Sequence, residues 1–174
     1  MIPLVDLKAQ YLTIETEINN AISETLSNAQ FVAGNSVREF EIEFAKYSSA
    51  KYGIGVASGT AALNLILRAC DIGPGDEVIT TPFTFFATAS VIIMAGAKPV
   101  FVDVEEDGFC LNPNQVESAI TEKTKAIQPV HLYGELADMP SLLEISKKNN
   151  LVLIEDSAQA HSADSWDGKA GSFG

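Results

Sequence analysis

Residues 151–161 read LVLIEDSAQAH and carry the strongest fold signal in the chain. Four consecutive aliphatic residues predict a strand buried on both faces, as in parallel sheets that helices cover from each side. Glu155 and Asp156 follow directly at the carboxyl end of this strand. Ligands of open α/β sheets bind beyond the carboxyl ends of the strands. This stretch therefore predicts both a fold class and the place of a site.

Four earlier strand-like runs precede it, with enough residues between them for crossover helices. These runs cover residues 53–57, 77–80, 99–104 and 126–130. We therefore predict an α/β fold with three αβα layers and a mostly parallel sheet.

Helices are expected between these strands and ahead of them, from apolar periodicity and capping residues. The expected positions are residues 11–30, 37–47 and 60–70, a start near Thr84, and starts after Asn112 and Asp138. The first two helices carry apolar stripes and precede the alternating pattern. We therefore expect a leading helical arm over residues 1–50 and an α/β domain over residues 51–174.

Composition narrows the classes of function. The 174 residues include 11 basic and 23 acidic side chains, which gives a net charge of −12 and disfavours nucleic-acid binding. No apolar run approaches the ~20 residues of a membrane span, and no signal peptide is evident. Cys70 and Cys110 form no CxxC motif, which favours a reducing cytoplasm and argues against a zinc site.

The turn from Ser58 through Gly59 and Thr60 to Ala61 opens a predicted helix. Free N–H groups at such a helix start suit a phosphate, although a simple helix cap is the alternative. The nearby glycines do not form GxGxxG with an acidic residue after the second strand, and no GxxxxGK[ST] motif is present. The sequence therefore disfavours both a dinucleotide-binding site and a nucleoside-triphosphate site.

The segments after the second and the last predicted strands contain further candidate binding residues. Phenylalanines at positions 83, 85 and 86 follow the second predicted strand, where a ring could stack on a flat ligand or could join the core. A carboxylate after the last strand, Glu155 or Asp156, could bind a metal, act as a base, hold a protonated ring nitrogen or cap a helix. The only histidines, His131 and His161, are predicted to be structural, so we expect no metal site.

Six blocks together resemble the DegT/DnrJ/StrS family, the nucleotide-sugar aminotransferases among the fold type I pyridoxal-phosphate enzymes. In chain order these are residues 2–7 (IPLVDL), 56–63 (VASGTAAL), 73–78 (GPGDEV), 82–85 (PFTF), 129–134 (PVHLYG) and 154–161 (IEDSAQAH). The resemblance covers the whole chain. It implies that residues 51–174 are an incomplete pyridoxal-phosphate-binding large domain, with the C-terminal small domain absent.

The resemblance also implies roles for individual residues. Those expected at the cofactor are Gly59, Thr60, Ala61, Phe85, Asp156 and Gln159. The turn at Gly59 would hold the phosphate, Phe85 would stack on the pyridine ring, and Gln159 would lie beside the phenolic oxygen. Asp156, the expected catalytic residue, would keep the ring nitrogen protonated, which makes the ring an electron sink.

The implied activity is transfer of an amino group from a glutamate-type amino acid to a keto sugar on a nucleotide, in sugar or cell-surface polysaccharide biosynthesis. A homodimer is implied as well. The family's Schiff-base lysine follows the segment matching residues 171–174, so we expect this chain to lack it and to be catalytically incomplete. Lys169, the nearest amine, lies in a predicted turn and is expected to be solvated.

Two alternatives stay open at this point. One is the sugar dehydratase branch of the same family, in which histidine replaces the lysine. The other is an inert truncated protein that still binds cofactor, sugar nucleotide or a partner.

Overall fold

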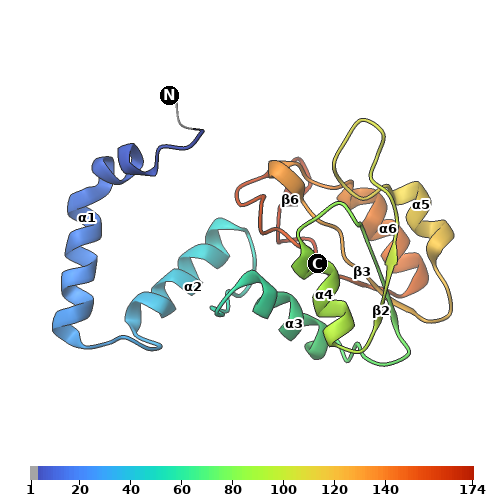
Figure 1. Cartoon of the computed structure of the whole chain (residues 1–174), viewed down its shortest axis with the longest axis horizontal. Coiled ribbons are helices and arrows are strands. Elements are labelled where there is room, and N and C mark those ends of the chain that lie inside the picture. Colours follow the sequence, from blue (N-terminus) through green and yellow to red (C-terminus); the bar gives the residue numbers. More distant parts are fainter. Residues whose placement is uncertain (1–3) are drawn as a thin grey trace. The chain divides into compact units, whose positions relative to one another are not determined.

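Four parallel strands form the central sheet in the computed structural model, which describes residues 4–174 (Figure 1). They are β1 (Glu77–Thr80), β2 (Lys98–Phe101), β3 (Thr124–Ile127) and β4 (Val152–Leu153), arranged in the order β2-β1-β3-β4. Every pairing in this sheet is parallel. The predicted α/β class with a parallel sheet is confirmed.

Helices cover both faces of the sheet because its side chains alternate along each strand. One face packs on α3 (Gly59–Ala69) and α4 (Phe86–Met94), the other on α5 (Pro113–Ala119) and α6 (Met139–Asn149). The labels β2 and β3 lie between α4 and α6 in Figure 1. Val78, Ala126 and Ile154 belong to the first core, and Ile79, Ile127 and Leu153 belong to the second.

Side-chain caps begin three of these helices where the sequence places them. Ser58 accepts a hydrogen bond from the N–H of Ala61, and Asp138 accepts one from Ser141. Asn112 caps α5, whose first residue is a proline. A cap satisfies an N–H that has no partner inside the helix, which fixes the helix start.

The predicted strand over residues 53–57 is wrong. This segment has no strand assignment, and Ile54 and Val56 are 82% and 40% exposed. A strand needs a neighbour for its backbone ladder, and the four-stranded sheet contains no such pairing for this segment. Glycines at 53 and 55 also weaken an extended run.

After β4 the chain continues without a further α-helix. A short antiparallel hairpin joins β5 (Asp164–Ser165) to β6 (Gly168–Lys169), and a 3₁₀ turn, η1 (Leu132–Gly134), lies after β3. The predicted turn over residues 166–169 is thus the tip and second strand of this hairpin.

The chain consists of two compact units, Met1–Ile42 and Glu43–Gly174. The first contains α1 (Leu7–Asn28) and most of α2 (Asn35–Tyr47), near the helix positions that periodicity predicts. The predicted apolar stripe of α1 is exposed, from 37% at Tyr11 to 62% at Leu26. Part of the sequence block at residues 2–7 lies outside the described residues.

Within the described residues, no helix combines the length and the apolar character that crossing a lipid bilayer requires.

Candidate active site

A cavity of about 260 Å³ lies at the carboxyl ends of the strands. Its walls come from the starts of α3 and α4 and from the segments that follow β3 and β4. The lining residues are Gly59, Thr60, Leu63, Thr84, Phe85, Ala87, Val130, Leu132, Asp156, Ala158 and Gln159. Five of the six residues expected at the cofactor are therefore brought together, and Ala61 is not among the lining residues.

Asp156 is the charged group in the cavity wall, and it is only 9% exposed. Thr88 Oγ1 donates to Asp156 Oδ2 at 2.8 Å, and Ala158 N–H donates to Oδ1 at 3.4 Å. Because the Thr88 proton is committed to Asp156, Thr84 Oγ1 donates in turn to Thr88 Oγ1 at 2.9 Å. No helix follows Asp156 directly, so the helix-cap interpretation of this residue is wrong.

The start of α3 presents backbone donors to the same cavity. Ser58 occupies the N–H of Ala61 through its side chain and that of Ala62 through its carbonyl. Gly59 and Thr60, the first two helical residues, keep N–H groups that have no partner inside the helix. A Cβ built at Gly59 would meet nothing within 4 Å, so the missing side chain leaves open space there.

The aromatic residues after β1 are exposed and do not belong to the core. Phe85, at the N-cap of α4, is 69% exposed and lines the cavity. Phe83 instead stacks on Phe109, with ring centroids 6.0 Å apart. Of the two alternatives left open by the sequence, the ring at Phe85 has the exposure that stacking on a ligand requires.

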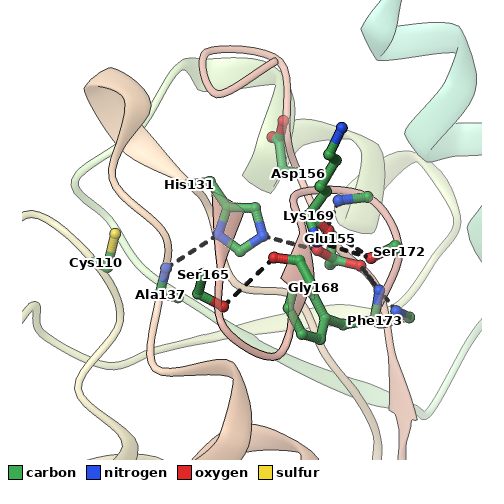
Figure 2. Close-up of polar contacts among 12 residues, drawn as sticks. Cys110, His131, Ala137, Glu155, Asp156, Ser165, Gly168, Lys169, Ser172 and Phe173 are labelled. Carbon is green, nitrogen blue, oxygen red and sulfur yellow. Dashed lines mark hydrogen bonds and ion pairs between the residues drawn. The ribbon is translucent and has the colours of Figure 1, made fainter. Parts of the chain in front are cut away.

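Behind the cavity, Glu155 and His131 form a buried pair (Figure 2). Their side chains are 3% and 0% exposed, and 2.9 Å separates Glu155 Oε2 from His131 Nε2. Burial acts to raise the pKa of Glu155, but hydrogen bonds from His131 and from three backbone N–H groups outweigh it. The pKa therefore lies below its ordinary value. His131 is a structural histidine, as predicted.

Lys169 departs from its predicted solvation. Its Nζ donates to the backbone oxygen of Tyr47 at 2.8 Å and lies 4.8 Å from the centre of the Tyr47 ring. The hairpin carries the amine to the end of α2, where exposed carbonyl groups favour a cation. The side chain therefore has a protein partner, and neither residue lines the cavity.

Sequence reasoning gave no role in this site to Thr84 and Thr88, and it placed Glu155 at this strand end without predicting its partners. The two threonines lie four residues apart, and a spacing of four places side chains on one helix face. This spacing could have suggested a hydroxyl chain to Asp156. No comparable signal in the sequence points from Glu155 to its partners, which lie 16 to 24 residues away along the chain.

The residues present fit pyridoxal phosphate. The two N–H groups at the start of α3 suit a phosphate, and the open space at Gly59 lets it approach the backbone. Asp156 supplies a buried carboxylate for a protonated ring nitrogen, and Phe85 supplies an exposed aromatic face. The cavity volume suits one small ring rather than a dinucleotide.

Solved structures place the fold among the fold type I pyridoxal-phosphate aminotransferases. The crystal structure of DesV from S. venezuelae superposes with a TM-score of 0.96 at 42% identity, covering 98% of this chain and 46% of that one. The model of the DegT/DnrJ/EryC1/StrS aminotransferase family matches residues 12–174. The chain belongs to this family, whose enzymes use pyridoxal phosphate.

Two curated relatives illustrate the range of the family. One, from Acidithiobacillus ferrooxidans, is a UDP-N-acetyl-3-dehydro-alpha-D-glucosamine 3-aminotransferase, 49% identical over 99% of this chain and 47% of its own length. Another, a pleiotropic regulatory protein from Geobacillus stearothermophilus, is 52% identical over 91% of this chain and 43% of its own length. The chain thus spans about half the length of these relatives.

Proposed function

We propose that this chain is part of a pyridoxal-phosphate-dependent aminotransferase that acts on a nucleotide-linked keto sugar, with residues 51–174 in the cofactor-binding large domain. The observation that carries the proposal is the convergence of Asp156, Phe85 and the start of α3 on one cavity. The relative from Acidithiobacillus ferrooxidans, named for a UDP-linked keto sugar, supports the substrate class.

Asp156 would hold the proton on the ring nitrogen, because a buried carboxylate favours the charged pyridinium beside it. Gly59 and Thr60 would donate backbone N–H groups to the phosphate, and Phe85 would cover one ring face. When bound, pyridoxal phosphate supplies the electron sink for amino-group transfer. Gln159 lines the same cavity and would contact the phenolic oxygen; Ala61 would contribute to the phosphate site through the turn that it closes.

We propose a glutamate-type amino acid as the amino donor, a homodimer as the working assembly and the cytoplasm as the location, all on the strength of the family resemblance. A chain with a net charge of −12 repels an anionic nucleotide. Positive groups from a second subunit would therefore help to bind the nucleotide.

We propose further that the 174-residue chain binds the cofactor reversibly and has no aminotransferase activity of its own. Lys169 supports this, since its Nζ is bound to the Tyr47 carbonyl and the residue does not line the cavity. A covalent bond to the cofactor needs a deprotonated amine positioned at the aldehyde.

Two measurements test the proposed function. Pyridoxamine phosphate, which cannot bond covalently to a lysine, should bind the chain saturably with one site in a fluorescence titration. Borohydride treatment with pyridoxal phosphate, followed by peptide mass mapping, should label no single lysine stoichiometrically. A chain without affinity for pyridoxamine phosphate would refute the cofactor site, and stoichiometric labelling of Lys169 would refute reversible binding.

A further inference from the structure

The buried Glu155–His131 pair has a defined proton arrangement. His131 Nδ1 accepts a hydrogen bond from the Ala137 N–H at 3.1 Å, so this nitrogen carries no proton. The proton therefore sits on Nε2 and is donated to Glu155 Oε2 at 2.9 Å. The ring is held from both sides, as Figure 2 shows.

Glu155 accepts three more hydrogen bonds, all from the backbone near residue 174. Gly171 N–H donates to Oε2 at 2.8 Å, while Phe173 and Gly174 N–H groups donate to Oε1 at 2.7 and 2.8 Å. Each carboxylate oxygen thus receives two donors. Only an ionised carboxylate offers four acceptor positions to four converging donors.

These contacts are continuous with the cavity wall. The backbone N–H of His131 donates to the Asp156 carbonyl at 3.0 Å, and the Asp156 N–H donates to the Pro129 carbonyl at 3.0 Å. Val130 and Leu132, on either side of His131, line the cavity together with Asp156. The strand ends that carry the site are therefore joined twice, by backbone bonds and by the Glu155–His131 pair.

We propose that Glu155 is a positioning residue for the cofactor site. It fixes the strand end that carries Asp156, and it anchors the backbone of residues 171–174 to that same strand end. This inference rests on the proposed function, because it assigns Glu155 an effect on how tightly and in which protonation state the cofactor ring is held. A purely structural Glu155 would change stability and leave cofactor binding in the folded chain unaltered.

Substitution of Glu155 by glutamine tests the carboxylate directly. An amide of the same shape has one accepting oxygen, so its NH₂ group faces at least one pair of donors and cannot pair with them. Glu77→Gln is the matched control. Glu77 is a buried carboxylate at the amino end of β1, away from the cavity, and it also binds neighbours across the sheet.

Two substitutions of His131 separate its two hydrogen bonds. Asparagine reaches the position of Nδ1, so His131→Asn can keep the bond from Ala137 and loses the donor to Glu155. Glutamine reaches the position of Nε2, so His131→Gln keeps the donor to Glu155 and loses the acceptor for Ala137. The proposal therefore predicts a larger effect for His131→Asn than for His131→Gln.

Two quantities are measured. The first is the Kd for pyridoxamine phosphate. The second is the pH at which bound pyridoxamine phosphate loses its ring proton, followed by its absorbance. Glu155→Gln and His131→Asn should raise the Kd about tenfold or more and move this pH downward. Glu77→Gln should bind within about twofold of the wild type, and His131→Gln should raise the Kd less than His131→Asn does. Folded Glu155→Gln and His131→Asn chains with wild-type Kd and pH dependence would overturn the inference.

A measurement on the wild-type chain covers the case in which these variants fail to fold. Coupling between the site and the Glu155 contacts is reciprocal, so pyridoxamine phosphate should slow hydrogen exchange at the N–H groups of Gly171, Phe173 and Gly174. Unchanged exchange at saturating pyridoxamine phosphate would overturn the inference. Absence of binding by the wild type would instead refute the proposed function on which it rests.

Discussion

The two ends of the sheet each hold a buried glutamate, and they hold it in different ways. At the amino end, Glu77 accepts hydrogen bonds from side chains, Thr121 Oγ1 at 2.7 Å and Lys98 Nζ at 2.9 Å. At the carboxyl end, Glu155 accepts from His131 and from three backbone N–H groups. The Lys98 side chain is 71% exposed, whereas the Glu155–His131 pair is almost fully buried.

The two glutamates therefore differ in how freely their hydrogen-bond donors can move. Hydrogen bonds from Thr121 and Lys98 lower the pKa of Glu77, but one of these partners is a flexible, solvated side chain. Three of the four donors to Glu155 are backbone N–H groups and the fourth is a buried ring, so their geometry depends less on side-chain freedom. The glutamate at the end of the sheet that carries the cavity is therefore held by donors with less conformational freedom.

The largest predicted effect is the loss of the Glu155 carboxylate. Glu155→Ala leaves the buried His131 ring and three backbone N–H groups without their acceptor, so we expect the free energy of unfolding to fall by about 3–5 kcal/mol. Urea denaturation followed by circular dichroism measures this change. Glu77→Ala is the comparison and should cost clearly less; an equal cost at both ends would remove the distinction.

The next effect concerns the hydroxyl that holds Asp156. Thr88→Val keeps the shape of the side chain but removes the donor at 2.8 Å from Asp156, which should lower the free energy of unfolding by about 1.5–3 kcal/mol. Thr88→Ser retains the hydroxyl and serves as the control. The hydroxyl role is contradicted if valine and serine destabilise the chain equally.

A smaller effect concerns the dependence of stability on acid at Glu155. The folded-state pKa of Glu155 lies below its ordinary value of 4.5, so its stabilising contribution is complete above that pH and is lost as pH falls through the folded pKa. His131 and Asp156 are its neighbouring titratable groups. Glu155→Gln should therefore show a flatter loss of stability with acid than the wild type.

Salt affects the two ends unequally. At about 1 M salt the Debye length is about 3 Å, so the Lys98–Glu77 pair, whose lysine is exposed, should weaken while the buried Glu155–His131 contact persists. Urea midpoints of Glu77→Gln and Glu155→Gln, measured at low and high salt, provide the test. A salt dependence of the same size for both variants would contradict the assignment.

The smallest effect is expected at Lys169. Lys169→Met keeps the aliphatic stem and removes the amine from Tyr47, which should lower the free energy of unfolding by less than about 1 kcal/mol. The affinity for pyridoxamine phosphate should be unchanged. A marked loss of affinity would show that the amine takes part in the cofactor site.

The sequence predicts most of the sheet because its signals are local. Consecutive aliphatic residues before Glu155 and the caps Asn112 and Asp138 determine elements within a few residues of themselves. The false strand over residues 53–57 shows the limit, because an apolar run does not reveal whether a neighbouring strand is present to pair with it.

The residues of the candidate site likewise fall into those that local sequence signals predict and those that they do not. Asp156, Phe85 and the start of α3 follow from the rule that ligands bind at the carboxyl edge, and all three line the cavity. Thr88 and Glu155 could not be assigned, since their roles depend on contacts between residues far apart in the chain. The partner of Lys169, 122 residues away, is a further example.

The most direct test of the central claim is the protonation of pyridoxamine phosphate bound to the wild type and to Asp156→Asn. A buried carboxylate should hold the ring proton, so in the wild type the pH of its loss should lie above that of free pyridoxamine phosphate. In Asp156→Asn this pH should fall by about 1–3 pH units, with weaker binding. Asp164→Asn, in the exposed hairpin, should behave as the wild type. An Asp156→Asn chain that is folded and binds with wild-type affinity and pH dependence would contradict the assignment of Asp156 to the ring nitrogen.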